Sequence, residues 1–314
     1  MTLAILCSGQ GGQHAAMFEL TGRCAPAQSV FSHASAILGQ DIRQWVLTAT
    51  PAELFANSSA QLLCSVQGLA AWQALDLEHV PTRDEIVLAG YSAGELASWG
   101  CAGLIAPTDV LHLAIMRAQA MDRAAGSDTG LASLRGLPRA ALERLCRAHG
   151  CEIAIVLAQD SFIVGGRRDA LALLAHEALA SGAQRTAMLP IGVAAHTSLL
   201  APASTEFHAR LRAVPPGASR IPGVRLLSGV DGDAVLDVAS GLDKLAQQIS
   251  HTVDWEACLT ACREARVTRV LELGPGRALA NMAREALPEA RCRALEEFRS
   301  LEGVRSWLHA DRDA

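Results

Sequence analysis

The stretch EIVLAGYSAGELASWG, residues 85–100, constrains the fold most, because an apolar run leads into Gly-x-Ser-x-Gly and a second apolar run follows. Gly90 and Gly94 permit a sharp turn from strand to helix, since side chains there would collide with the neighbouring strand and helix. Such a turn presents the hydroxyl of Ser92 at the carboxyl edge of a sheet, and the next backbone N–H, that of Ala93, points to where an oxyanion would form. The pattern predicts a nucleophilic serine; the alternative is a small residue in an ordinary βα turn.

Strands and helices alternate in the flanking sequence. LAILC (3–7) is an apolar run that ends in the Gly-rich SGQGGQ, and residues 61–76 are apolar around most of a helix, as expected for a helix buried in a core. RVLELGPGRALANMAREAL (269–287) is again predicted as strand, turn and helix, whereas AAHTSLLAPASTEFHARLR (194–212) is predicted as one helix, and VRLLSG as a strand. The alternation predicts a parallel sheet covered by helices.

The pattern changes after about residue 126. Four short strands are predicted there, with two amphipathic helices between them, in the order GLASLRG, PRAALERLCRAHG, CEIAIVLA, SFIVGG, RRDALALLAHEALASG and AQRTAML. The order β-α-β-β-α-β is that of the ferredoxin-like unit. We therefore expect residues 128–193 to form a small inserted domain, and residues 1–127 and 194–314 to form one discontinuous large domain that holds both chain termini.

Composition excludes several classes of function. The chain has 314 residues, half of them hydrophobic, and a formal net charge of −5, so it can bury a large core and gives no support to nucleic-acid binding. Its one lysine, Lys244, follows no Gly-rich phosphate loop, which excludes a standard P-loop nucleotidase. A pyridoxal phosphate Schiff base would also have to use Lys244.

The nine cysteines are odd in number and lack paired spacing, so they are interpreted as reduced thiols. Cys258 and Cys262 would share a helical face, but no further Cys or His pair lies beside them in the sequence, and no metal site is predicted. The N-terminus has no basic leader, and no stretch approaches twenty apolar residues. We expect a cytoplasmic protein that neither spans nor binds a membrane.

A serine needs a base, because its free hydroxyl is a poor nucleophile at neutral pH. Of the ten histidines, His196 is the strongest candidate. It follows PIGVAA, where the small domain returns to the large one and a cleft would form, and its small neighbours leave the ring accessible. The others are placed in predicted helices, near loops or at helix ends.

The loop SGQGGQ offers a second set of backbone N–H groups for an oxyanion. A dinucleotide-binding fingerprint is the alternative. It is disfavoured because Gly9-x-Gly11 is followed by His14 where the third glycine should stand.

Arg117 lies in LHLAIMRAQAM, an otherwise apolar helix. A buried arginine without a partner is costly, so Arg117 either pairs with a carboxylate or receives an anionic ligand. Asp109 and Asp122 do not lie at the helical spacing to pair with it. The alternative is an arginine whose head extends into solvent.

Together these segments resemble the malonyl-CoA:acyl-carrier-protein transacylase family over nearly the whole chain, in the order GQGGQ, GYSAGE, an apolar helix with Arg, AAH, DW and LELGPG. The resemblance implies an α/β-hydrolase-like large domain with a parallel sheet and an inserted ferredoxin-like small domain. It implies a Ser-His pair without an acidic third member, in which Ser92 accepts the acyl group and His196 is its general base.

The same resemblance implies roles for five more residues. The backbone N–H groups of Gln10 and Ala93 would form the oxyanion hole, and Arg117 would bind the free carboxylate of the malonyl group in a bidentate pair. The backbone carbonyl of Gln248 would orient the histidine, and Gln61 matches a glutamine near the site.

The chain also departs from the common family pattern. Tyr91 stands where a histidine usually precedes the nucleophile, Ala93 replaces a bulkier residue, and SGQGGQ replaces a Pro-Gly start. With its surroundings, Tyr91 makes the chain look more like the transacylase subunit of malonate decarboxylase, the epsilon or H subunit.

The resulting expectation is ping-pong malonyl transfer from malonyl-CoA to the prosthetic-group thiol of an acyl carrier protein, the malonate decarboxylase carrier subunit, with no permanently bound cofactor. The alternative is the malonyl-CoA:ACP transacylase of fatty-acid or polyketide synthesis. Two others are a serine esterase of the α/β-hydrolase class, with Asp160 or Asp169 as its acid, and a non-catalytic subunit that docks a carrier protein.

Overall fold

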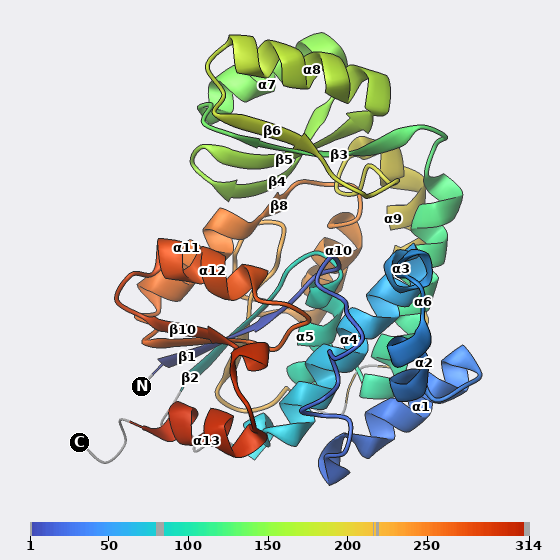
Figure 1. The fold of residues 1–314 in the computed structure, drawn as a ribbon, viewed down its shortest axis with the longest axis vertical. Coiled ribbons are helices and arrows are strands. Elements are labelled where there is room, and N and C mark those ends of the chain that lie inside the picture. The colour runs from blue at the N-terminus through green and yellow to red at the C-terminus, as the bar shows by residue number, and fades with distance from the viewer. Residues whose placement is uncertain (1, 80–84, 216, 218–219, 311–314) are drawn as a thin grey trace.

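The apolar runs that begin the chain and precede Ser92 form neighbouring strands of a parallel sheet (Figure 1). A computed structural model of the chain describes residues 2–79, 85–215, 217 and 220–310. The strand order in this sheet is β10-β9-β1-β2-β7, and every neighbouring pair is parallel. Its strands are β1 (Thr2–Cys7), β2 (Glu85–Gly90), β7 (Val224–Leu226), β9 (Arg269–Glu272) and β10 (Arg291–Ala294).

Helices surround this sheet, as the alternating pattern predicts. They are α1 (Gln28–Leu38), α2 (Ile42–Thr48), α3 (Pro51–Phe55), α4 (Asn57–Ala74), α5 (Gly94–Cys101), α6 (Pro107–Ala124), α9 (Ala201–Ala213), α10 (Val238–Gln247), α11 (Trp255–Glu264), α12 (Ala278–Ala286) and α13 (Leu301–His309). In Figure 1, α4, α5 and α6 lie together beside the sheet. Among the described residues, no helix is both long and apolar enough to span a membrane.

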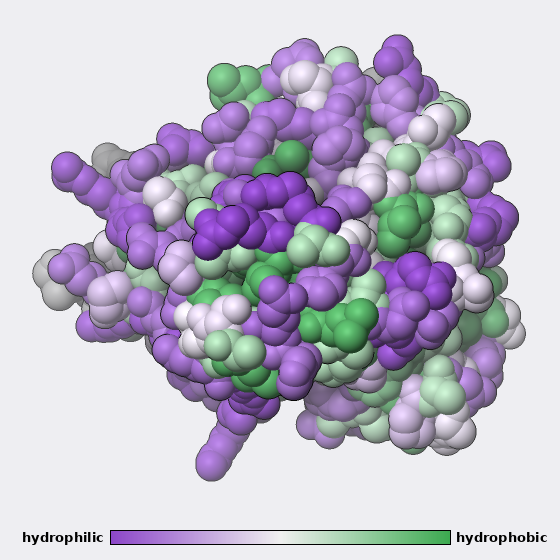
Figure 2. All heavy atoms as spheres, turned by 90° about the horizontal axis from the view of Figure 1, so that it is seen from above, coloured by the Kyte–Doolittle hydropathy of each residue, from purple (hydrophilic) through white to green (hydrophobic). Residues whose placement is uncertain are grey.

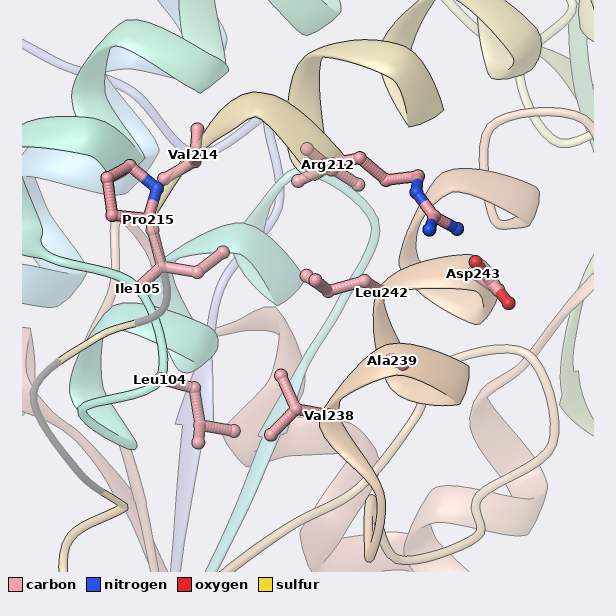
Figure 3. A pocket seen from close by; sticks show the side chains of 10 residues that line it. Leu104, Ile105, Arg212, Val214, Pro215, Val238, Ala239, Leu242 and Asp243 are labelled. Carbon is pink, nitrogen blue, oxygen red and sulfur yellow. The ribbon is translucent and has the colours of Figure 1, made fainter.

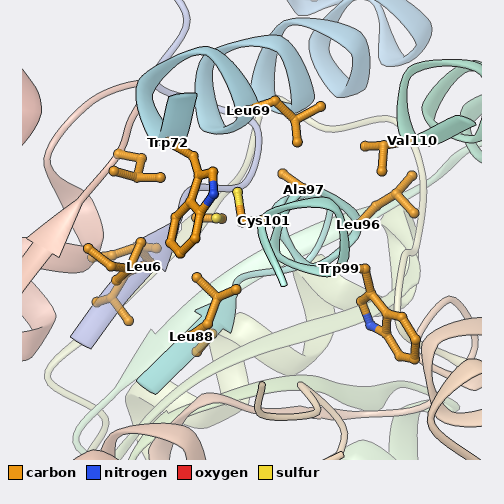
Figure 4. Packing of buried hydrophobic residues seen from close by; sticks show 14 of the residues in the cluster. Leu6, Leu69, Trp72, Leu88, Leu96, Ala97, Trp99, Cys101 and Val110 are labelled. Carbon is orange, nitrogen blue, oxygen red and sulfur yellow. The ribbon is translucent and has the colours of Figure 1, made fainter. Parts of the chain in front are cut away.

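The main core lies where α5 packs between the sheet and α4. Leu6 and Leu88 from the strands, Leu69 from α4 and Leu96 from α5 are all buried (Figure 4). Burying each such side chain contributes about 1.5–3 kcal/mol. Gly68 brings α4 close to α5, because an added Cβ there would lie 3.0 Å from the Cβ of Ala97. This packing fixes the helix that follows Ser92.

A second sheet lies above the first and has the order β6-β3-β5-β4-β8 (Figure 1). Its elements are β3 (Thr129–Arg135), α7 (Arg139–His149), β4 (Glu152–Ala158), β5 (Ser161–Arg167), α8 (Arg168–Ala180), β6 (Arg185–Met188) and β8 (Val253–Asp254). From β3 to β6 the order is β-α-β-β-α-β, as predicted. Viewed from above, this side of the molecule is mainly hydrophilic, with hydrophobic residues in small separate groups (Figure 2).

The fifth strand of the second sheet was not predicted. β8 pairs in parallel with β4, through Ile155 opposite Val253 and Val156 opposite Asp254. It comes from the segment 194–314, which the sequence assigns to the large domain. The boundaries at 127/128 and 193/194 therefore stay a prediction, and the outer limits, residues 1 and 314, lie outside the described residues.

One predicted helix is shorter than expected. The interpretation of 194–212 as one helix is wrong in its first part, because α9 begins at Ala201. His196 has a φ of 64°, and Thr197 is extended, so neither residue fits a helix. His196 consequently lies on a turn that precedes the helix.

Three chain segments meet at the carboxyl edge of the first sheet. β1, β2 and β9 lie side by side, and they end at Cys7, Gly90 and Glu272. Because parallel strands all end at the same edge, the loops that follow them are brought together there. SGQGGQ, the Ser92 turn and the GPG turn are those three loops.

Gly94 lets α5 start directly against β1. A Cβ at this position would lie 2.2 Å from the backbone oxygen of Cys7. We expect Gly94→Ala to lower the free energy of unfolding by about 3 kcal/mol, because backbone on both sides must move. Thermal unfolding followed by circular dichroism measures the loss. Gly192→Ala is the control, since nothing lies within 4 Å of a Cβ added there; equal melting temperatures for the two variants would contradict the prediction.

Candidate active site

Ser92 lies at the top of the tight turn between β2 and α5. Its φ is 52°, in the left-handed region that residues other than glycine rarely adopt. Gly90 permits the turn, because a Cβ there would lie 2.2 Å from the Cα of Glu95. The strand-turn-helix predicted from Gly-x-Ser-x-Gly is therefore present, with the serine at its apex.

The structure brings His196 to Ser92, although 104 positions separate them in the sequence. Ser92 Oγ lies 2.8 Å from His196 Nε2, and His196 Nδ1 lies 2.5 Å from the backbone oxygen of Gln248. A carbonyl oxygen only accepts hydrogen bonds, so Nδ1 carries the proton in neutral imidazole. Nε2 is then free to accept the hydrogen of the Ser92 hydroxyl, which is the geometry that general-base activation requires.

The surroundings of His196 keep its ring neutral. The side chain is 2% exposed, and burial, followed by the nearby charge of Arg117, lowers the pKa of His196 from 6.5 to about 4. The hydrogen bond from Nδ1 to Gln248 acts in the opposite direction. At neutral pH the ring is thus able to accept a proton.

This environment predicts an unusual pH profile. With p-nitrophenyl acetate, an uncharged acyl donor, we expect the acylation rate to stay level below neutral pH and to fall only as the pH approaches about 4. In Arg117→Ala the loss of a positive charge raises the pKa of His196, so the fall begins at a higher pH. Stopped-flow release of p-nitrophenol measures both profiles. A wild-type midpoint near 6.5, the ordinary histidine pKa, would contradict the assignment.

Arg117 lies inside the protein beside this pair. Its side chain is 2% exposed, which excludes the alternative of a head that extends into solvent. Nη1 donates to Gln61 Oε1 and Nη2 donates to Gln248 Oε1, each at 2.8 Å. Burial lowers the pKa of Arg117 to about 10, and the charge of Glu95 opposes that effect.

Both direct partners of Arg117 are neutral amides. Within the part of the chain that the structure describes, no carboxylate forms an ion pair with it. A buried guanidinium with only neutral partners is a strong site for an anion, because a carboxylate can take two parallel hydrogen bonds from it. The arrangement favours an anionic ligand over a structural ion pair.

The loop after β1 lies directly against the Ser92 turn. A Cβ on Gly9 would lie 2.7 Å from the backbone oxygen of Tyr91, and one on Gly12 would lie 2.6 Å from that of Pro275. Among the described residues, the backbone N–H groups of Gln10 and Ala93 donate no hydrogen bond. Both groups therefore stay available beside the serine, as an oxyanion hole requires.

Two buried carboxylates near the site were missed by the sequence reasoning. Ser8 Oγ donates to Glu272 Oε1 at 2.7 Å, and Ala280 N–H donates to Glu272 Oε2 at 2.7 Å, so Glu272 ties the loop after β1 to the start of α12. Glu95 lies in the first turn of α5 and is 1% exposed. The available signal was a lone charged residue in an apolar segment, which is also what marked Arg117.

The structure also contains a cavity that lies apart from these residues. This cavity of about 230 Å³ is lined by Leu104, Ile105, Val238 and Leu242, with Arg212 and Asp243 at its edge (Figure 3). Its lining includes none of the predicted site residues.

One group of possible metal ligands is found among the described residues. It consists of Asp76, Glu78 and His79, all exposed. It contains no predicted site residue, and the expected absence of a metal site stays a prediction.

A serine hydrogen-bonded to a neutral histidine at the carboxyl edge of a parallel sheet is typical of α/β enzymes that pass acyl groups through a serine. Over 297 residues the chain is 30% identical to the malonyl CoA-acyl carrier protein transacylase of Mycobacterium tuberculosis, covering 94% of this chain and 96% of that protein. The chain belongs to the malonyl CoA-acyl carrier protein transacylase family and is an acyltransferase.

Further comparisons agree with this membership. The Escherichia coli protein of the same name is 28% identical over 308 residues, covering 94% of this chain and 96% of that protein. The crystal structure of an acyl-carrier-protein S-malonyltransferase from Burkholderia pseudomallei is 27% identical, with a TM-score of 0.89, and the match covers 98% of this chain and 100% of that one. These matches confirm the predicted α/β fold. No protein-family model matches the chain.

Proposed function

We propose that this protein transfers the malonyl group of malonyl-CoA to the prosthetic-group thiol of an acyl carrier protein. The observation that carries the proposal is the position of Arg117, a buried cation with only amide partners beside the Ser92–His196 pair. A malonyl group has a carboxylate at the far end from its thioester, so one substrate matches both features. The names of the relatives support the same substrate and acceptor.

In the proposed first half-reaction, Ser92 Oγ attacks the thioester carbon while His196 Nε2 takes the hydroxyl proton. The N–H groups of Gln10 and Ala93 stabilise the oxyanion. The C–S bond then breaks, and His196 gives its proton to the departing thiolate of CoA. Malonyl-Ser92 remains, with its carboxylate held by Arg117.

The second half-reaction runs in the opposite sense. The carrier thiol gives its proton to His196 and attacks malonyl-Ser92, the ester C–O bond breaks, and Ser92 Oγ recovers the proton from His196. In this scheme the backbone oxygen of Gln248 keeps Nδ1 protonated in both steps, and Gln61 holds one side of Arg117. The balance is one thioester consumed and one formed, with no redox change.

The comparisons fit a transacylase of fatty-acid or polyketide synthesis, the alternative given above, better than the malonate decarboxylase subunit that the sequence first suggested. The matched relatives carry the name malonyl CoA-acyl carrier protein transacylase, so we favour a transacylase that serves fatty-acid or polyketide synthesis. The malonate decarboxylase subunit, inferred from Tyr91, finds no support among them. Tyr91 packs edge-on against Trp255, with ring centroids 5.3 Å apart, which gives it a packing role.

The esterase alternative needs an acidic partner for His196. The Nδ1 atom of His196 instead contacts a backbone oxygen. Asp169 pairs with Arg167, and both side chains are more than half exposed. This geometry favours acyl transfer over a Ser-His-Asp hydrolase built on the predicted acids.

Two further expectations remain proposals. We propose the large and small domains with the boundaries given above, and a cytoplasmic location. Limited proteolysis with mass analysis tests the boundaries, and cell fractionation tests the location.

Intact-mass analysis tests the proposed function. After malonyl-CoA is mixed with the protein, we expect a mass increase of one malonyl group, and addition of a holo acyl carrier protein should move that group to the carrier. Apo carrier, which lacks the thiol, is the control. No covalent adduct at any malonyl-CoA concentration would overturn the proposal, and rapid hydrolysis without a thiol acceptor would favour the esterase.

A further inference from the structure

The carboxylate of Glu95 is buried, and both of its oxygens accept hydrogen bonds. Its Oε1 accepts a hydrogen bond from the backbone N–H of Gly229 at 3.1 Å, and its Oε2 accepts one from the side-chain amide of Gln248 at 2.5 Å. Gly229 must lack a side chain, because a Cβ there would lie 2.5 Å from Glu95 Oε2. The charged groups that act on this carboxyl are Arg117 and Asp231. Burial, followed by the charge of Glu95, raises the pKa of the neighbouring Cys258 thiol, which stays neutral.

The amide of Gln248 joins Glu95 to the rest of the site. Its Nε2 donates to Glu95 and also to the backbone oxygen of Ser92, at 3.0 Å, while its Oε1 accepts from Arg117. Gln248 is fully buried, so no water competes for these bonds. The side chain of Gln248 thus contacts the carboxylate of Glu95, the backbone of the Ser92 turn and the guanidinium of Arg117.

The direction of this amide is decided by its neighbours. An ionised carboxylate only accepts hydrogen bonds, so it requires the NH₂ group of Gln248 to face it. The oxygen of the amide then faces Arg117. The reverse orientation would set oxygen against oxygen at Glu95 and N–H against N–H at Arg117, each costly in a buried site.

We propose that Glu95 is a positioning residue: through the amide of Gln248 it holds Arg117 in the orientation that receives an acyl carboxylate, and so sets the preference for carboxylated over uncharged acyl groups. The inference rests on the proposed function. Glu95 touches neither the reacting atoms nor the guanidinium, so it can orient Arg117 only through Gln248; the direct effect of its charge on Arg117 is separated below.

Glu95→Gln tests the proposal with almost no change of shape. The backbone N–H of Gly229 requires an oxygen, so the new NH₂ faces Gln248, where two NH₂ groups meet. Gln248 relieves this conflict only by turning away from Arg117. We expect the ratio of kcat/KM for malonyl-CoA to that for acetyl-CoA to fall about tenfold, the scale of one hydrogen bond to a charged group.

Glu95→Gln also removes a negative charge that would repel a second carboxylate. A pure charge effect would therefore raise the ratio. Gln248→Met separates the two, since it keeps Glu95 and the backbone oxygen that meets His196 but removes the amide. We expect it to lower the ratio as Glu95→Gln does. If Glu95→Gln does not fold, as judged by circular dichroism, an unchanged ratio in Gln248→Met would still overturn the proposal, because Gln248 is the link between Glu95 and Arg117.

The matched control is Glu272→Gln. Glu272 is also a buried glutamate; burial raises the pKa of both carboxyls to about 7, so assays are run at mildly alkaline pH. Its partners, Ser8 and Ala280, do not touch Gln248. The control should change both substrates equally and leave the ratio unaltered.

A double-mutant cycle with Arg117→Ala completes the test. In that background Glu95→Gln should alter the ratio no further. An unchanged or increased ratio in Glu95→Gln, an equal fall in Glu272→Gln, or an additive fall in the double variant would each overturn the proposal. Failure of the proposed function is a separate result, since the wild-type protein would then form no malonyl adduct.

Discussion

Replacing Ser92 with alanine is expected to abolish the acyl-enzyme and to lower malonyl transfer by roughly 10⁴-fold or more. The hydroxyl is the atom that His196 Nε2 meets, at 2.8 Å, and alanine leaves nothing at that position to attack a thioester. The backbone should change little, because alanine and serine pay a similar cost at a φ of 52°. The loss should therefore be one of chemistry and not of folding.

Intact mass after mixing with malonyl-CoA measures this prediction, with circular dichroism as the check on folding. Ser98→Ala is the matched control. Ser98 is a buried serine in α5, the helix that follows the Ser92 turn, and its Oγ donates to the backbone oxygen of Glu95 at 2.6 Å. Adduct formation that persists in Ser92→Ala would identify another nucleophile.

The second large effect is expected for Arg117→Ala, which should lower the preference for malonyl-CoA over acetyl-CoA by about 100-fold. In the wild-type protein an acetyl group leaves the buried guanidinium without an anion, and an unpaired charge in such a site costs a few kcal/mol. Alanine removes both the favourable pair for malonyl and the penalty for acetyl. Malonyl transfer should fall while acetyl transfer rises or stays level.

Competition between the two thioesters for one sample, read by mass, gives the ratio directly. Arg123→Ala is the control from the same helix, since Arg123 is exposed and pairs with Glu206 at 2.6 Å. Discrimination between malonyl and acetyl that survives unchanged in Arg117→Ala would show that another group reads the carboxylate.

Local patterns predicted those elements whose own residues decide their structure. The apolar run EIVLAG is β2 from Glu85 to Gly90, and the βαββαβ order of the second sheet was visible in its alternation. β8 was not visible, because a strand of two residues exists only through its pairing with β4. The start of α9 was misplaced because the left-handed φ of His196 depends on contacts beyond its own segment.

The candidate site divides in the same way. Ser92 and Arg117 could be found from their segments, since each breaks a local rule: a serine between two glycines, and a cation in an apolar helix. His196 was selected as the base candidate from its place where the small domain returns to the large one, whereas the role of Gln248 was implied only by family resemblance. That both residues meet at this site is a matter of tertiary geometry. Glu95 could not be assigned a partner, because the Gly229 amide that binds it lies 134 positions away.

The pairing of β8 with β4 has a consequence for protein engineering. β8 begins five positions after Gln248, and the linking Thr252 donates through Oγ1 to the backbone oxygen of Ile153 at 2.7 Å. The second sheet is therefore hydrogen-bonded to the segment 248–254, which begins with the residue whose backbone oxygen contacts His196. We expect it not to be an interchangeable module: a chimaera that imports only residues 128–193 from a relative would place a foreign β4 beside the resident β8. An exchange that preserves the position of His196, the proposed general base, must carry 248–254 with it.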